Sequence, residues 1–447
     1  MPGIFPSRKQ IERELAILNT PTYQEAHEGL AAYIRRLQEA TTATELRLLQ
    51  RDLVLDTNAR QKALAEFVAE RRPPAKARID ELKSREPKPK LELAAAQRIL
   101  RGADHAEAVA RALQHATRVL ADGMVWRAFE FDRTTISILG KEEPVAHHAD
   151  DKGFAAELAA LDLVEERFGL LTFHNDTTNV LRRGDITAIS LEDGSPFPHP
   201  IEVKAGMGRG SKQVARIKES IEMIRARRFI VQTEFRTHIG ELAELIATAK
   251  HCGYANRRLD CHFVHVDYRH WGDHEEHVEL LAGRALRELA WSGGDRLVLV
   301  GMSSVSRIRD RGNPVVELAP TSIFPLAAED IADLLLGFVD VSVHLNTELL
   351  GLRFNEHGMR ASFTLTPTSA THFLEARRGF RGFLMPAYVR EQMLHELMTV
   401  ETLVELSDWI LRSGKTREWV DIEKAPIVGF ANERTVWSPG SHIDLAA

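Results

Sequence analysis

The residues best suited to chemistry lie in two short runs, Asp185–Thr187 and Ile201–Lys204. Side chains alternate along a strand, so a strand over the second run points Glu202 and Lys204 to the same face. If the two runs pair as neighbouring strands, the carboxylates of Asp185 and Glu202 converge. Two carboxylates and water suit a hard Mg²⁺ ion, and a nearby lysine can position a water or offset phosphate charge. Together they predict metal-assisted attack of water on a phosphodiester bond.

This pattern resembles the PD-(D/E)XK nuclease superfamily, and the resemblance covers about residues 150–230. It implies that Asp185 and Glu202 bind Mg²⁺, for which Mn²⁺ can substitute, and that Lys204 is the catalytic lysine. The backbone carbonyl of Val203 is implied as a further metal ligand. Many members add an acidic residue on the helix before the sheet, and Glu157 matches that position. By the same resemblance, the cleaved product carries a 5′-phosphate.

Two positions depart from the superfamily pattern or extend it. Gly184 stands where the superfamily name has proline, a position that varies among members. Gln213 matches a glutamine that one branch places on the helix after the lysine, but Ile217 stands where that branch has tyrosine. The alternative interpretation of Asp185, Glu202 and Lys204 is a solvated strand face whose charges form salt bridges.

Positive charge is concentrated just after these residues. The segment 205–228 contains seven basic side chains and only two acidic ones, Glu219 and Glu222. A local excess of positive charge beside carboxylates is what binding to a phosphate backbone requires. The alternative is a solvated helix face. The residues expected to contact nucleic acid are Arg183, Arg209, Lys212, Gln213 and Arg216.

Other motifs do not carry a function. The glycine-rich run 206–212 lacks the spacing of an ATP-binding P-loop. Histidines and cysteines are frequent over 251–277, but without the paired spacing of a zinc site, so buried strand residues are favoured. The segment 301–305 lacks the second glycine of a nucleophile elbow.

The elements that would position the candidate residues alternate in type. Apolar residues at helical spacing predict a helix over 150–168, and a helix is also expected over 211–227. Between them, strands are predicted at Leu170–His174, Asp185–Leu191 and Pro200–Ala205, with a turn over 192–196. Strand 229–235, helix 239–250 and strand 259–266 follow. This order predicts a mixed sheet flanked by helices.

The flanking regions differ from this centre. Residues 8–121 are rich in strong helix formers, with Thr42 or Thr44 as a helix cap and breaks at 71–74 and at 87–89. Residues 125–139 contain aromatic and β-branched side chains and predict a strand or hairpin. After residue 276, helices are expected at 277–291, 327–336 and 389–411, strands at 296–301 and 315–323, and a hairpin over 352–365.

Composition limits the class of protein. The chain has 447 residues with 58 basic and 64 acidic side chains, a net charge of −6. This total excludes a uniformly basic nucleic-acid binder but permits one basic strip. Only two cysteines, Cys252 and Cys261, exclude a disulfide-rich secreted scaffold. No apolar run approaches the roughly 20 residues of a membrane span, and the N-terminus lacks a signal pattern, so we expect a cytoplasmic protein without a membrane partner.

We therefore expect an α/β (α+β) protein whose centre is a restriction-endonuclease-like mixed sheet. The predicted division is an all-α region over 1–122, the nuclease-like domain over 123–275 and an α/β region of unknown role over 276–447. The predicted function is Mg²⁺-dependent endonuclease action on DNA, by analogy in bacterial restriction or phage defence. The alternatives are a non-catalytic nucleic-acid-binding or assembly module with this fold, and a nuclease that acts on RNA. A protein partner or a second copy would bind through the N-terminal helices.

Overall fold

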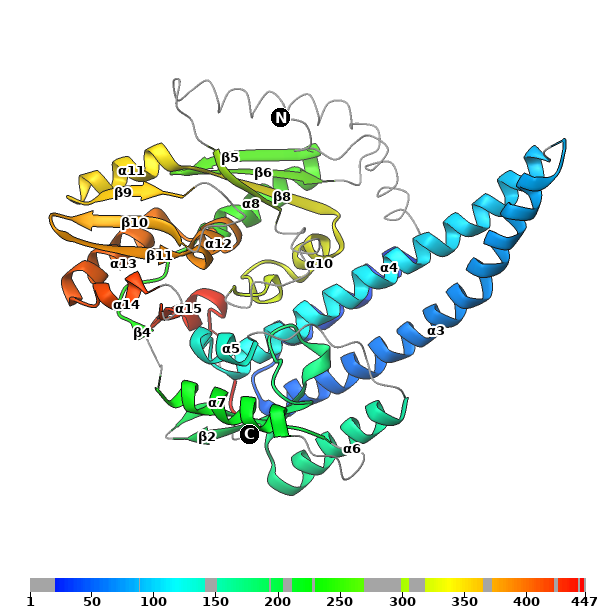
Figure 1. Cartoon of the computed structure of the whole chain (residues 1–447), viewed down its shortest axis with the longest axis horizontal. Helices are drawn as coiled ribbons and strands as arrows, with labels where there is room; N and C mark the ends of the chain where they lie inside the picture. The colour runs from blue at the N-terminus through cyan, green and yellow to red at the C-terminus, as the bar shows by residue number, and fades with distance from the viewer. Residues whose placement is uncertain are drawn as a thin grey trace.

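The computed structural model combines long helices with small sheets, so the class is mixed helix and strand, α+β, as predicted (Figure 1). Two long helices extend away from a body that contains the sheets. Within the described part of the chain, no helix is long and apolar enough to cross a membrane. The structure describes residues 21–87, 89–140, 151–192, 194–203, 211–226, 230–268, 299–304, 318–364, 372–421, 425–440 and 443–445.

The N-terminal part of the described chain is helical, as predicted. Helix α2 spans Pro21–Glu39, α3 spans Ala43–Ser84 and α4 spans Lys90–Ala128. Thr42 begins α3 with a capping box, in which its hydroxyl accepts from the Glu45 backbone N–H and the Glu45 carboxylate accepts from the Thr42 backbone N–H. This confirms Thr42 as a helix cap.

Only one of the two predicted helix breaks is present. The chain does break between α3 and α4, around Pro87 and Pro89. The break predicted at 71–74 is wrong, because Pro73 and Pro74 lie inside α3. Proline removes a helical hydrogen bond and disfavours a helix interior. Here α3 continues because its outer half packs on α4, through the buried apolar cluster Ile79, Leu82 and Ala96.

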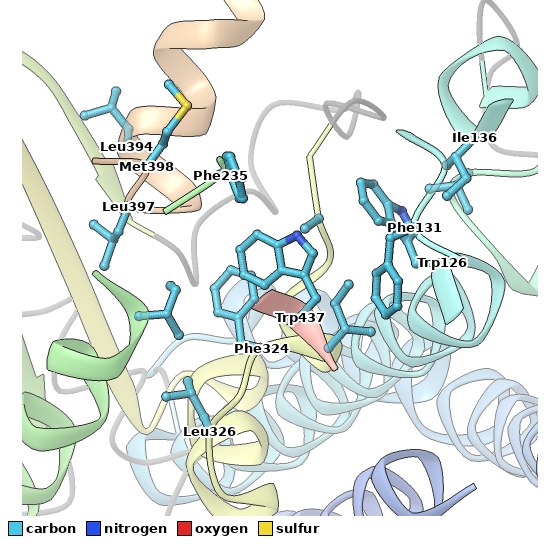
Figure 2. Packing of buried hydrophobic residues seen from close by; sticks show 14 of the residues in the cluster. Trp126, Phe131, Ile136, Phe235, Phe324, Leu326, Leu394, Leu397, Met398 and Trp437 are labelled. Atoms are coloured by element: carbon cyan, nitrogen blue, oxygen red, sulfur yellow. The ribbon is translucent and has the colours of Figure 1, made fainter. Parts of the chain in front are cut away.

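The strand or hairpin predicted over 125–139 is also wrong. Helix α4 extends to Ala128, and a short helix α5 spans Arg133–Gly140, with every residue of α5 buried. Aromatic and β-branched residues are typical of strands, but they suit any element that is buried on all sides. Figure 2 shows the reason, since Trp126, Phe131 and Ile136 point into one apolar cluster with Phe324 and Trp437.

The sheet that carries the candidate residues is antiparallel, in the order β1-β2-β3. Strand β1 spans Leu171–His174, β2 spans Ile186–Glu192 and β3 spans Ser195–Ile201. Helix α6, Asp151–Phe168, precedes the sheet, and α7, Ser211–Ala226, follows it. The two predicted helices, the first two strands and the turn are confirmed.

The third strand of this sheet differs from the prediction Pro200–Ala205. It begins earlier and ends at Ile201, so Glu202 and Val203 lie after the strand. Pro196, Pro198 and Pro200 occupy alternate positions of β3 and lack N–H donors on one side, which is tolerated only at a sheet edge. Strand β3 is indeed the edge of its sheet. The expected alternation of Glu202 with Lys204 therefore does not apply.

A second sheet has the order β5-β6-β8-β7. Its strands are β5 Tyr254–Leu259, β6 His262–Tyr268, β7 Leu299–Ser304 and β8 Val339–Asn346. Helices α8, Ile239–Cys252, and α10, Ala328–Leu336, accompany it as predicted. Most of the strand predicted at 259–266 lies in β6; Leu259 is the last residue of β5, and a turn at Asp260 and Cys261 separates the two strands. This sheet combines two strands that precede residue 275 with two strands that follow it. The division of the chain into domains at residues 122 and 275 stays a prediction.

The C-terminal part forms a third sheet covered by helices. It contains α11 Thr347–Glu356, β9 Arg360–Phe363, β10 His372–Arg378, β11 Arg381–Pro386, α12 Ala387–His395, α13 Val400–Ser413 and α14 Thr416–Val420. The hairpin predicted over 352–365 is wrong, because α11 occupies its first half. The helices predicted over 389–411 are confirmed. The helix predicted over 277–291 lies outside the described residues.

Shorter elements complete the chain. Strands β4, Ile230–Val231, and β12, Gly429–Phe430, pair in parallel, and α15 spans Glu433–Trp437. Of the described residues 230–235 in the strand predicted at 229–235, only Ile230 and Val231 are in a strand. Over the described end of the strand predicted at 315–323, the chain forms a 3₁₀ turn, Thr321–Ile323.

A buried ion-pair cluster joins distant parts of the chain at the centre of the core. The fully buried Arg133 guanidinium donates to Glu396 at 2.7 and 3.1 Å and to Glu433 at 2.8 and 3.1 Å. The rings of Trp126 and Phe235 lie 5.0 and 5.7 Å from its charge. A single buried cation therefore ties helix α5 to two C-terminal segments.

Candidate functional site

Asp185 immediately precedes β2 and is held against the end of β3. Its backbone N–H donates to the Ile201 carbonyl at 2.9 Å. Its carboxylate Oδ2 accepts from the Val203 N–H at 2.6 Å. The β2–β3 hairpin thus brings Asp185 beside Glu202 and Val203, as the sequence predicts. The contact comes from the chain just beyond the strand end rather than from paired strand positions.

Gly184 allows this close approach. It has a φ of 78°, and a Cβ added there would lie 2.6 Å from the Ile201 carbonyl oxygen. Proline, with φ fixed near −65°, cannot adopt this backbone conformation. The Asn175 side chain holds the same peptides, donating to the carbonyls of Arg183 at 3.0 Å and Gly184 at 2.9 Å. The absence of proline here is therefore a structural requirement.

The pKa of Asp185 is raised by burial and by neighbouring carboxylates. Burial raises the pKa of Asp185 to about 6, the Val203 hydrogen bond opposes the shift, and the negative charges of Glu202, Glu157 and Asp176 add to it. The sequence predicts two of these neighbours. Asp176 was not predicted; it lies in the 3₁₀ turn Asn175–Thr177 that directly follows β1. Its place in a polar loop between two predicted strands was the only available signal.

Glu157 is tied to the sheet by a histidine that the sequence analysis missed. Its Oε2 lies 2.6 Å from Nε2 of His174, the last residue of β1. The His174 side chain is fully buried, whereas Glu157 is 13% exposed. The Phe154 ring contacts the His174 ring edge-on, with centroids 5.7 Å apart. A buried histidine thus fixes where the α6 carboxylate lies.

The helical region supports the loop that leads to Asp185. Asp122, on α4, accepts hydrogen bonds from the Asn179 N–H at 2.6 Å, the Asn179 side chain at 2.8 Å and the Val180 N–H at 3.2 Å. Burial raises the pKa of Asp122 to about 6, and these donors oppose the shift. The Arg182 N–H donates to the Leu139 carbonyl on α5 at 3.0 Å. The C-terminal part of α4, together with α5, therefore positions the loop that leads to Asp185.

The remaining predicted residues are distributed differently. Lys204 and Arg209 lie outside the described residues. Lys212 and Gln213 lie in the first turn of α7, where only the backbone is described. Arg216 is exposed on α7. Arg183 was expected to contact nucleic acid, but it is only 6% exposed. A buried guanidinium contributes positive charge beneath the surface rather than a surface contact.

The donor set is made of oxygen ligands. Within the described ranges, no group of three or more His, Cys, Asp and Glu side chains could hold a metal ion. Mg²⁺ does not need such a cage, because it keeps several waters and is commonly bound by one or two carboxylates. Asp185 with Glu202 meets that smaller requirement in chemical type.

Comparisons with models of protein families, with curated proteins and with solved structures found no match.

Proposed function

We propose that this protein is a metal-dependent nuclease related to the PD-(D/E)XK superfamily, with a restriction-endonuclease-like centre, that hydrolyses DNA phosphodiester bonds. The observation that carries the proposal is the contact of the Asp185 carboxylate with the Val203 N–H, at 2.6 Å. It sets the first acid of the pattern beside the second, Glu202, although 16 residues separate them in the sequence. The register of the β2–β3 hairpin, with Ile186 opposite Ile201, places the two acids opposite each other at its open end.

The residues present fit a divalent cation. Asp185 and Glu202, with the Val203 carbonyl and several waters, would hold Mg²⁺ or Mn²⁺, and the Glu157 carboxylate would add negative charge nearby. The raised pKa of Asp185 supports this, because part of the shift comes from neighbouring negative charges that a cation would neutralise. When bound, the ion would supply charge stabilisation at the phosphate and lower the pKa of a water.

The chain itself would contribute positioning. The Val203 N–H fixes one oxygen of Asp185, and His174 fixes the Glu157 carboxylate. Lys204, next in the chain, would hold the attacking water or offset phosphate charge. The exposed Arg216 and its basic neighbours on α7 would bind the DNA backbone.

The test is cleavage of a supercoiled plasmid with Mg²⁺ or Mn²⁺. Asp185→Asn, Glu202→Gln and Lys204→Ala should each abolish cleavage, and each variant should unfold at the wild-type temperature. Glu192→Gln is the matched control, because Glu192 lies at the opposite end of β2 and is exposed. Cleavage that survives Asp185→Asn and Lys204→Ala would refute the assignment.

Two outcomes distinguish the alternatives. Cleavage of structured or single-stranded RNA but not of DNA would favour the RNA nuclease. Binding of DNA without cleavage of any nucleic acid, under both metals, would favour a non-catalytic module with the same fold. A nuclease role in restriction or phage defence is a separate expectation, which a plating assay with and without the Asp185→Asn substitution would test.

A further inference from the structure

An exposed aromatic side chain marks the tip of the β10–β11 hairpin. The two strands are joined by Gly379 and Phe380 alone. Gly379 has a φ of 59°, which suits a two-residue hairpin turn. Phe380 takes the other turn position and is fully exposed, whereas Phe383 on β11 is buried in the core. A polar residue would serve the turn equally well, so packing does not explain Phe380.

The same tip accumulates like charges. Arg378 on β10 lies directly opposite Arg381 on β11, and Arg377 lies opposite Arg360 on β9. Like charges facing each other across neighbouring strands destabilise a sheet. Two carboxylates offset this charge only in part, because Glu375 pairs with Arg377 and Asp408 pairs with Arg378, while four arginines face one another here. The tip therefore combines an exposed aromatic ring with an excess of arginines over carboxylates.

The arginines are held in defined positions. Arg378 contacts Asp408 at 2.5 Å and donates to the His357 carbonyl at 2.9 Å. Arg377 donates to Glu375 at 2.6 Å and lies across Gly382, where an added Cβ would come within 2.9 Å of the arginine Cγ. Glycine at 382 thus leaves room for the Arg377 side chain. Fixed guanidinium groups lose less entropy when they bind an anion.

We propose that this hairpin tip, residues 377–381, binds single-stranded nucleic acid. An unpaired base stacks on Phe380, and backbone phosphates contact the arginines. Stacking on an aromatic ring combined with positive charge is the general way in which proteins hold single strands. The hairpin lies on the opposite side of the body from the α3–α4 arm (Figure 1). The inference does not require that the chain cleaves nucleic acid.

The experiment measures binding of fluorescein-labelled oligothymidylate by fluorescence anisotropy, in EDTA so that no metal-dependent cleavage occurs. Phe380→Ala should weaken binding by about tenfold or more, the loss of one stacked base. Phe380→Trp should retain binding, because indole also stacks. The matched control is Phe168→Ala, since Phe168 is also an exposed aromatic next to an arginine but lies at the end of α6.

The arginines are tested by salt dependence. Arg381→Gln should weaken binding and reduce the slope of affinity against salt concentration by about one contact. A fully paired duplex of the same length should compete poorly. Three results would overturn the proposal: no binding of the oligonucleotide by wild type, equal binding by Phe380→Ala and wild type, or equal losses in Phe380→Ala and Phe168→Ala. The nuclease proposal is tested separately, by the cleavage assay. Asp185→Asn should bind the oligonucleotide as tightly as wild type, because Asp185 does not belong to the hairpin tip.

Discussion

Replacing Gly184 with alanine tests whether the approach of the two strand ends builds the site. Gly184 and Gly194 both have positive φ, 78° and 75°, but only Gly184 is crowded. A Cβ at Gly184 would lie 2.6 Å from the Ile201 carbonyl oxygen, whereas nothing lies within 4 Å of one at Gly194. Gly194→Ala is therefore a matched control for backbone strain alone.

The magnitudes follow from these two differences. The left-handed conformation costs an alanine about 1–2 kcal/mol, which applies to both variants. The crowded site adds about 1–3 kcal/mol, because the obstructing atom is backbone and the end of β3 must shift. We expect Gly184→Ala to lower the free energy of unfolding by about 2–5 kcal/mol and Gly194→Ala by about 1–2 kcal/mol.

Urea unfolding followed by circular dichroism measures both values. Movement of β3 should also separate Val203 from Asp185, so Gly184→Ala should weaken binding of Mn²⁺ measured by calorimetry, while Gly194→Ala should not. Equal stability losses in the two variants would show that the crowding is absent. Equal Mn²⁺ affinity in Gly184→Ala and wild type would refute the inference that this contact forms the site.

Four further predictions concern buried polar groups. Arg133→Met should lower the free energy of unfolding by about 3–5 kcal/mol in urea unfolding, because it leaves Glu396 and Glu433 buried without their cation. Glu433→Gln should cost less, since burial already raises the pKa of Glu433 to about 7; a larger loss than for Arg133→Met would contradict this reasoning. Burial lowers the pKa of His262 to about 4. Between about pH 6.5 and 4, His262 is therefore protonated in the unfolded chain but neutral in the folded chain. The free energy of unfolding falls over this range as the pH is lowered. Relative to His262→Gln, wild type should lose about 2 kcal/mol more between about pH 7 and 5; parallel pH profiles for the two proteins would exclude the effect. His174→Gln should retain Mn²⁺ binding through its amide donor, whereas His174→Leu should weaken it at least severalfold, and equal calorimetric affinities would mean that His174 does not position the α6 carboxylate.

The local elements of the candidate site could be predicted from sequence because each has a local cause. The turn before β3 and the apolar spacing in α6 depend on residues close together in the chain. Asp185 and Glu202 could be singled out because their types and spacing suit metal chemistry. His174 and Asp176 could not, since their contribution depends on contacts across the sheet that no spacing encodes.

The errors share a physical reason. Residues 125–139 are rich in strand-forming types because they are buried, and burial in a helix selects the same apolar side chains. Pro73 and Pro74 would end an isolated helix, but packing of α3 on α4 outweighs that local cost. The start of β3 was predicted too late because it contains Pro196, Pro198 and Pro200, which disfavour a strand. They are tolerated because β3 is the edge of its sheet.

The sequence by itself determined the fold class, most helices and the two acidic residues at the open end of the β2–β3 hairpin, because periodicity, capping and residue chemistry are local properties. Only the tertiary structure decided that Asp185 meets Val203 beyond the end of the strand, that Glu157 is held by His174, and that Arg133 joins α5 to the C-terminal segments. It also decided that Phe380 is exposed beside facing arginines. Each of these depends on which distant segments pack together, and burial and charge pairing between such segments are properties of the folded chain.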